Sequence, residues 1–127
     1  MSTVALGVSP DSKGVGVTPL VHRRIIAAQW ANTGLVDGLN VTGRNDLRYN
    51  VSAGVAVCSR GDADGKTIAY YEGGQTGAVA AGDPSNPRID IVWIQAHNLM
   101  EYKDSDNYVT VGVTQGSPSA SLAEPTI

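Results

Sequence analysis

The spacing of apolar residues changes once along the chain, at about residue 35, and predicts a helix before that point. Residues 18–34 open with Thr18-Pro19, after which apolar residues recur every three or four positions. Threonine at the N-cap followed by proline at the first helical position is a typical helix start, and this spacing gathers apolar side chains on one stripe. We therefore expect one short amphipathic helix that ends near Gly34. Its apolar stripe contains Val21, Ile25 and Ala28.

After residue 35, short apolar runs are separated by breaks that are rich in Gly, Asn and Asp. Such runs favour β-strands, and the breaks favour turns between them. The longest run, Arg88–His97, is apolar on both faces, so we expect a central strand with Trp93 in the core. A charged turn and a further alternating run follow it, which predicts a hairpin. The other expected strands are Val36–Thr42, Leu47–Val51, Val55–Ser59, Thr67–Glu72, Gly77–Ala81 and Tyr108–Thr114.

The predicted fold class is mainly β: an N-terminal arm and one short helix followed by a compact antiparallel β-sandwich or small barrel. The first residues mix glycine, proline and single valines without a helical or strand period, which is typical of an extended arm. The last residues are linker-like and end on Ile127 without a stop signal, so we expect a longer parent protein. The expected divisions are the extended arm at 1–17, the short helix and turn at 18–34, the β domain at 35–116 and the linker-like C-terminal tail at 117–127.

The composition supports a folded domain and weighs against two classes of partner. The chain has 42% hydrophobic and 17% charged residues, unlike a disordered segment, and its 15 glycines and 6 prolines favour short strands with many turns. The net charge of −3 argues against a surface that follows nucleic-acid phosphates. No apolar run approaches the ~20 residues of a membrane span, and no secretory signal is recognisable. We therefore expect no nucleic acid, no membrane insertion and synthesis in the cytoplasm.

The motifs of the chain predict no catalytic, cofactor or metal site. Asp62–Thr67 contains fragments of a calcium loop and of a phosphate loop, but Tyr71 stands where the first needs glutamate and Arg60 where the second needs glycine. This segment is more typical of a polar hairpin turn. The single cysteine, Cys58, excludes an intrachain disulfide, and the two histidines lack metal-ligand spacing. We expect a non-enzymatic protein without a cofactor.

The most distinctive segment is the turn that precedes the longest strand. Two prolines three positions apart fix an extended, tightly turned entry into that strand. We expect Asp83 to accept backbone N–H groups of the turn and Arg88 to pair with a nearby carboxylate. Asp83 and Asp90 could also approach one another as an acid–base pair, although their turn and strand contexts favour capping and ion pairing. The structural turn is assigned to Asp83, Pro84, Pro87, Arg88 and Asp90.

Three segments, in this order, resemble one known family. They are Val51–Val57, the tyrosine-rich Ala69–Gly74, and Gly82–Asp90, which leads into the apolar strand. Over about residues 20–127, the chain resembles the N-terminal module of minor tail, baseplate and receptor-binding proteins of siphophages, especially those of actinobacterial hosts. The resemblance implies a fold-bearing, multimeric adaptor of a virion, made in the cytoplasm of the bacterial host, whose distal parts touch the host.

The expected function is that of a non-enzymatic bacteriophage virion protein, a tail or baseplate attachment or adaptor module that acts in assembly. We expect a homotrimer that contacts other virion proteins of the tail, baseplate or capsid, through an exposed apolar face on the helix or through the arm. Capsid decoration or a head-fibre role is the alternative, because no distal domain follows in this sequence. The expected interface residues are Arg23, Arg24, Ile25, Ile26 and Trp30.

A carbohydrate-binding module that recognises a host surface glycan is a further alternative. Aromatic side chains stack on sugar rings, but only 6% of the residues are aromatic, and buried aromatics more often belong to a core. A hydrolase of cell-wall polymers is less favoured, because no nucleophile or metal site is recognisable. The aromatic residues considered for sugar stacking are Tyr49, Tyr70, Tyr71 and Trp93.

Overall fold

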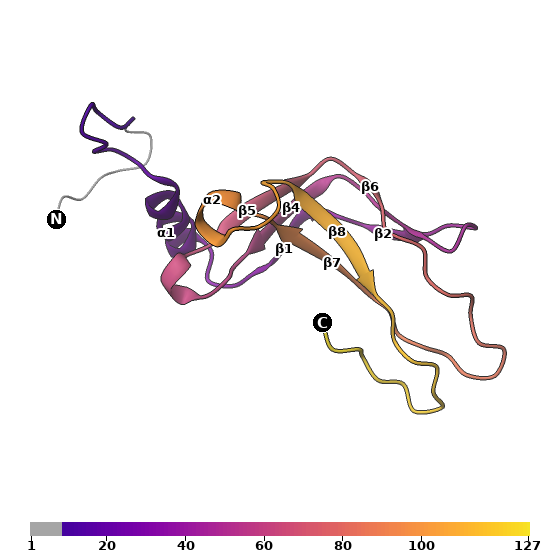
Figure 1. Ribbon diagram of the computed structural model, residues 1–127. Helices are drawn as coiled ribbons and strands as arrows, with labels where there is room; N and C mark the ends of the chain where they lie inside the picture. Colours follow the sequence, from indigo (N-terminus) through magenta and orange to yellow (C-terminus); the bar gives the residue numbers. More distant parts are fainter. Residues whose placement is uncertain (1–8) are drawn as a thin grey trace.

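A computed structural model describes residues 9–127, and in this part the chain is mainly β, as predicted (Figure 1). All of its strand pairs are antiparallel, and no closed barrel forms among residues 9–127. The first sheet has the order β1-β4-β5, with β1 at Gly34–Gly38, β4 at Gly54–Cys58 and β5 at Thr67–Tyr71. The second has the order β2-β3-β6, with β2 at Val41–Gly43, β3 at Tyr49–Val51 and β6 at Gly74–Gln75. The last two strands form a hairpin, with β7 at Ile91–Ala96 and β8 at Val109–Thr114.

The predicted helix is present as α1, Pro19–Gln29. It begins where the sequence indicates, because Thr18 Oγ1 accepts the backbone N–H of Val21 at 3.2 Å. The helix attaches to the β domain by the face of Arg23 and Ile26, which are 9% and 7% exposed. The predicted stripe is therefore displaced, because Val21 and Ile25 are only half-buried and Ala28 is exposed. No helix in the described residues is long and apolar enough to cross a bilayer.

The turn between β4 and β5 contains the short 3-10 helix η1, Asp62–Asp64, and confirms the predicted polar hairpin turn. It packs against α1, since the Lys66 N–H donates to Arg23 O at 2.9 Å. A second short helix, α2 (Leu99–Tyr102), follows β7 and lies near α1 at the same end of the molecule (Figure 1). The two connections and α1 therefore build that end together.

The hydrophobic core lies between the first sheet and the β7-β8 hairpin. Ala56 of β4 pairs with Ala69 of β5, and these small side chains, 2% and 1% exposed, let the hairpin approach the sheet closely. Of the two predicted arrangements, a closed barrel is not formed by the described residues, whose strands lie in three separate antiparallel sheets. The buried centre is Leu39, Val51 and Ala56, and Cys58, Tyr71, Val92, Ile94 and Val111 pack against it, half-buried.

The prediction of one strand at Val36–Thr42 is wrong, because the chain turns within it and continues as β2 in the second sheet. Leu39 stands at the turn with a φ of +56° and sends its side chain into the core, where it is 6% exposed. Gly38 precedes it with a φ of +63°, and a Cβ at this position would lie 2.1 Å from Ala53 O. The chain therefore turns to bury Leu39 instead of continuing as one strand with alternating apolar and polar residues.

The prediction of a strand at Gly77–Ala81 is also wrong. β6 ends at Gln75, and the following backbone is held by other groups: the Val79 N–H donates to Leu47 O at 2.8 Å, and Ala80 O accepts from Arg88 Nη2 at 2.6 Å. At Ala80, the Arg88 side chain therefore supplies the hydrogen bond that the backbone of a neighbouring strand would otherwise supply.

Trp93 is not in the core, contrary to our expectation. Alternation along β7 turns Val92 and Ile94 toward the core and leaves Trp93 half-buried on the other side. Its ring lies over Gly112 of β8, and its Nε1–H donates to Thr114 Oγ1 at 3.1 Å. A Cβ at residue 112 would approach the ring to 2.3 Å, so the glycine makes this close packing possible.

The two ends of the described chain are partly tied to the domain. The proposed arm at 1–17 lies in part outside the described residues; within it, Asp11 Oδ1 accepts the N–H groups of Lys13 and Val15 at 2.8 and 2.9 Å in a local turn. In the tail, the Ser119 N–H donates to Pro87 O at 2.9 Å. The tail therefore starts along the distinctive turn instead of leaving the domain at once.

Candidate functional site

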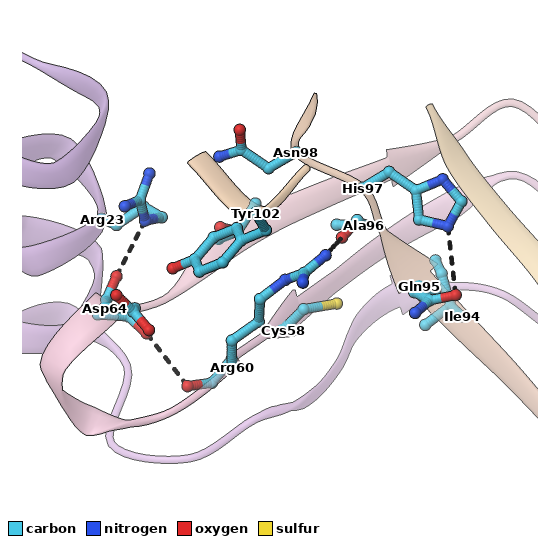
Figure 2. A pocket seen from close by; sticks show the side chains of 13 residues that line it. Arg23, Cys58, Arg60, Asp64, Ile94, Gln95, Ala96, His97, Asn98 and Tyr102 are labelled. Carbon is cyan, nitrogen blue, oxygen red and sulfur yellow. Dashed lines mark hydrogen bonds between the residues drawn. The ribbon is translucent and has the colours of Figure 1, made fainter. Parts of the chain in front are cut away.

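Three hollows on the described surface are candidates for a functional site. The first is a polar cleft of about 280 Å³ where α1, η1 and the β7-β8 connection meet (Figure 2). The second is a polar cleft of about 400 Å³ beside the turn at residues 83–90. The third is an apolar groove of about 90 Å³ between the β1-β2 region and the β7-β8 hairpin. Within residues 9–127, no group of His, Cys, Asp and Glu side chains could hold a metal ion.

In the first cleft, two arginines are engaged by carboxylates of the β7-β8 connection. Arg23 is 9% exposed; its Nη2 lies 2.5 Å from Glu101 Oε2, and its Nε–H donates to Asp64 O at 2.9 Å. Arg60 pairs with Asp104, and its guanidinium carbon lies 4.2 Å from the centre of the Tyr102 ring, along which Figure 2 shows the side chain lying. These contacts fasten the connection to α1 and to the β4-β5 turn.

The histidine of this cleft is engaged as well. His97 Nδ1 lies 2.7 Å from Asp106 Oδ1, and its Nε2 lies 3.2 Å from Gln95 Oε1. The pKa of Asp106 lies below its usual value, first because the Tyr108 N–H donates to it and then because of His97. Burial raises the pKa of the Cys58 thiol, so it is protonated near neutral pH, and within the described residues no base contacts it. Of the cleft groups described, His97 and Asp106 are therefore bonded to one another, and the Cys58 thiol is not activated as a thiolate.

The second cleft is organised by the ion pair of Arg88 and Asp90, as the sequence predicted for Arg88. Arg88 Nε lies 2.9 Å from Asp90 Oδ1, and the two side chains are only 11% and 6% exposed. Asp90 also accepts the Tyr49 hydroxyl at 2.9 Å and the Gly116 N–H at 3.1 Å. The pair therefore joins β3, the start of β7 and the end of β8. Tyr49 and Asp90 are 41 positions apart in the sequence.

Asp83 has the local role that was predicted for it. Its Oδ1 accepts the backbone N–H groups of Ser85 and Asn86 at 2.8 and 2.7 Å, around the bend at Pro84. These two bonds lower its pKa. At Asp90, burial acts in the opposite direction, but the bonds from Arg88, Gly116 and Tyr49 outweigh it and the pKa is again lowered. Asp83 is thus bonded to its own turn and Asp90 to Arg88, Tyr49 and Gly116, contacts that favour capping and ion pairing over an acid–base pair.

The apolar groove is the third candidate, and we did not predict it from the sequence. Its exposed side chains include Leu35 (67%) and Val41 (47%), and Leu39 and Val51 of the core form its deepest part. Leu35 belongs to β1, which is an edge strand of the first sheet. The sequence feature that could have indicated this groove is the adjacent apolar pair Leu35-Val36, which lies on the edge strand. The remaining lining residues are Val92, Trp93, Ile94 and Val111.

The interface residues expected on the helix do not form one exposed patch. Arg23 and Ile26 are buried within the chain, so they cannot contact a partner in this conformation. Ile25 is half-buried, whereas Arg24 is exposed and Trp30 is 38% exposed. The face of Arg23 and Ile26 holds α1 on its own domain, and the exposed apolar surface lies more on the strands.

No family model, curated protein or solved structure matches this chain. The resemblance to siphophage modules therefore rests on the three sequence segments alone.

The lowered pKa values of the aspartates lead to a pH prediction. In Asp83, Asp90, Asp104 and Asp106, the folded-state pKa is lowered by hydrogen bonds. As pH falls, these aspartates take up protons in the unfolded chain first, near the usual pKa of about 3.9, while in the folded chain they stay ionised. Because the unfolded state then binds more protons than the folded state, the free energy of unfolding falls. We expect a melting temperature that is constant from about pH 6 to 5 and declines below about pH 4. A melting temperature unchanged down to pH 3 would contradict these contacts.

Proposed function

We propose that this chain is a non-enzymatic structural module of a bacteriophage virion, a tail or baseplate attachment or adaptor domain that acts as a homo-oligomer. The three segments that resemble siphophage proteins form its framework. Val51–Val57 contains most of β4 and Ala69–Gly74 contains the second half of β5, and these two strands pair with one another. Gly82–Asp90 ends at the buried ion pair. Segments of this kind stabilise the fold of the domain, and an assembly module needs a stable fold more than it needs a catalytic site.

The observation that carries the assembly role is the apolar surface that the strands leave exposed in the described residues. Leu35 and Val36 of β1 are 67% and 41% exposed, and Val41 of β2 is 47% exposed. Exposed apolar patches mark surfaces that contact a partner.

The polar clefts support a structural role as well. Their arginines are engaged within the chain: Arg23 with Glu101, Arg60 with Asp104 and Arg88 with Asp90. An enzyme of this size would keep an acid, a base or a nucleophile available to a substrate. Here the ionisable groups fasten turns and connections to one another.

Sugar binding is less well supported than assembly. The Tyr49 hydroxyl is committed to Asp90, Tyr71 is half-buried in the core and Trp93 is half-buried over Gly112. Of the aromatic residues considered for sugar stacking, only Tyr70 is clearly exposed, at 61%. A glycan array that gave specific binding, abolished by Tyr70→Ala, would favour this alternative.

The homo-oligomer is tested by the mass of the particle in solution. Light scattering coupled to size exclusion should give about 40 kDa for a trimer, three times the 13.2 kDa of one chain. Only a 13.2 kDa species across micromolar concentrations would contradict self-association. Locating the protein in virions by cryo-electron microscopy tests the virion role and separates tail or baseplate from capsid decoration.

A further inference from the structure

Arg48 differs from the other arginines of the second cleft, because no carboxylate within residues 9–127 pairs with it. Arg88 is paired with Asp90. Arg44 Nε and Nη2 each lie 2.9 Å from a carboxylate oxygen of Asp46. Arg48 donates one hydrogen bond among the described residues, from its Nη1 to a backbone carbonyl at 3.2 Å. The residue is half-buried, and charged groups that are withdrawn from water usually have a partner of opposite charge.

The backbone on both sides of Arg48 is fixed by the fold. The Val79 N–H donates to Leu47 O at 2.8 Å, and the Tyr49 N–H donates to Thr76 Oγ1 at 3.2 Å. Thr76, whose carbonyl accepts the Arg48 hydrogen bond, is 1% exposed, so the guanidinium is anchored to a buried part of the domain. Because the side chain is already positioned, less conformational entropy is lost when a ligand binds to it.

The two carboxylates that line the second cleft have other partners. Asp90 is paired with Arg88, and Asp83 Oδ1 accepts two backbone N–H groups of its own turn. Asp83 Oδ2 and the side-chain amide of Asn86 have no hydrogen-bond partner within residues 9–127, and both residues line the cleft. Carboxylate and amide groups bond well to hydroxyl groups. The cleft therefore combines one available cation with groups that suit neutral polar atoms.

The size of the second cleft indicates a small organic ligand. Its volume of about 400 Å³ lies within the range of ~300–1,000 Å³ that is typical of pockets for small molecules. An inorganic anion would fill only part of it. The planar fork of a guanidinium matches the paired oxygens of a carboxylate or a phosphate, so an oxyanion is the group that suits Arg48.

We propose that the second cleft binds a small polyhydroxylated molecule whose carboxylate or phosphate group pairs with Arg48. Asp83 Oδ2 and the Asn86 amide then form hydrogen bonds with its hydroxyl groups. This site goes beyond the proposed assembly role and does not depend on it, because the residues that form the cleft all belong to one chain.

Titrations of the whole chain followed by NMR test this site. Glucuronate carries a carboxylate and glycerol phosphate carries a phosphate on a polyhydroxylated body. At constant ionic strength, which removes general screening effects, both should shift the Arg48 Nε–H signal along a saturable curve with a Kd on the order of 1 mM. Glucose and glycerol, the neutral counterparts, should give no saturable shift. Inorganic phosphate, which lacks the organic body, should bind at least about 10-fold more weakly.

A matched pair of variants tests the role of the guanidinium. Arg48→Gln should weaken the binding of glucuronate and of glycerol phosphate at least about 10-fold, because the bidentate partner is lost. Arg24→Gln removes the same charge from an exposed position on α1, outside the cleft, and should bind both probes as the wild type does. Circular dichroism checks that both variants are folded. If Arg48→Gln does not fold, the identity of the signals that shift in the wild-type protein decides the matter.

Three results would overturn the assignment. Shifts that grow linearly with the concentration of the acidic probes, or that are equally large in Arg48→Gln, would show general ionic effects only. Saturable shifts confined to residues outside the second cleft would place the ligand elsewhere. Inorganic phosphate that bound as tightly as glycerol phosphate would contradict the organic ligand. All three leave the assembly role standing, because that role is tested by the mass of the particle in solution.

Discussion

Replacing Asp90 with alanine is expected to lower the free energy of unfolding by about 2–4 kcal/mol. The substitution leaves the Arg88 guanidinium, 11% exposed, without its carboxylate, and removes the acceptor of the Tyr49 hydroxyl and of the Gly116 N–H. Loss of one partner of a fully buried ion pair costs about 3–5 kcal/mol. We expect a lower value here because Arg88 and Asp90 line the second cleft and are not fully buried. Urea titration of both proteins measures the difference.

Two control variants separate charge from hydrogen bonding at this site. Asp90→Asn keeps the size and one acceptor oxygen, so it should lose less stability than Asp90→Ala. Asp83→Ala removes only the local bonds to Ser85 and Asn86 of an exposed turn, and its effect should be clearly smaller. Equal losses for Asp83→Ala and Asp90→Ala would show that the long-range contacts of Asp90 contribute nothing.

Replacing Leu39 with alanine should lower the free energy of unfolding by about 2–4 kcal/mol. Leu39 is 6% exposed and lies in the buried centre with Val51 and Ala56, so truncation removes apolar burial and leaves a cavity. The positive φ at this position should cost leucine and alanine about the same, since both residues have a Cβ. The measured loss therefore reports packing rather than backbone strain.

The measurement is again a denaturant titration, with Val36→Ala as the control. Val36 lies three positions earlier on β1 and is 41% exposed, so its truncation should cost less than about 1 kcal/mol. If Leu39→Ala were as mild as Val36→Ala, the core would not be centred where β1 and β2 meet. Chemical shifts of Val51 should move in the Leu39 variant only.

Several features were predictable because the groups that decide them are close in sequence. The start of α1 depends on Thr18 and Val21, and the bend after Asp83 depends on two N–H groups within three residues. The β4-β5 turn and the β7-β8 hairpin also follow from breaks between alternating runs. A local hydrogen bond or a short loop closes regardless of the rest of the fold, so the residues around it carry the information.

Assignments that depended on which face is covered were less successful. Alternation identified the two faces of β7 correctly, but it could not tell that the core would lie on the side of Val92 and leave Trp93 half-buried. In the same way, the helical stripe of α1 suggested a surface for a partner, yet Ile26 packs on its own domain. Periodicity indicates that a face is apolar, and only the packing decides what covers it.

The sequence by itself determined the mainly β class, the helix α1, the hairpins and the local role of Asp83, because each rests on spacing and hydrogen bonds within a few residues. The tertiary structure decided that Leu39 splits a strand in order to reach the core and that Asp90 joins Tyr49 to Gly116. It also decided that a groove opens beside Leu35 while Met100 stays in solvent. These features depend on contacts between segments that lie far apart in sequence, whose pairing is set by the burial of the whole domain.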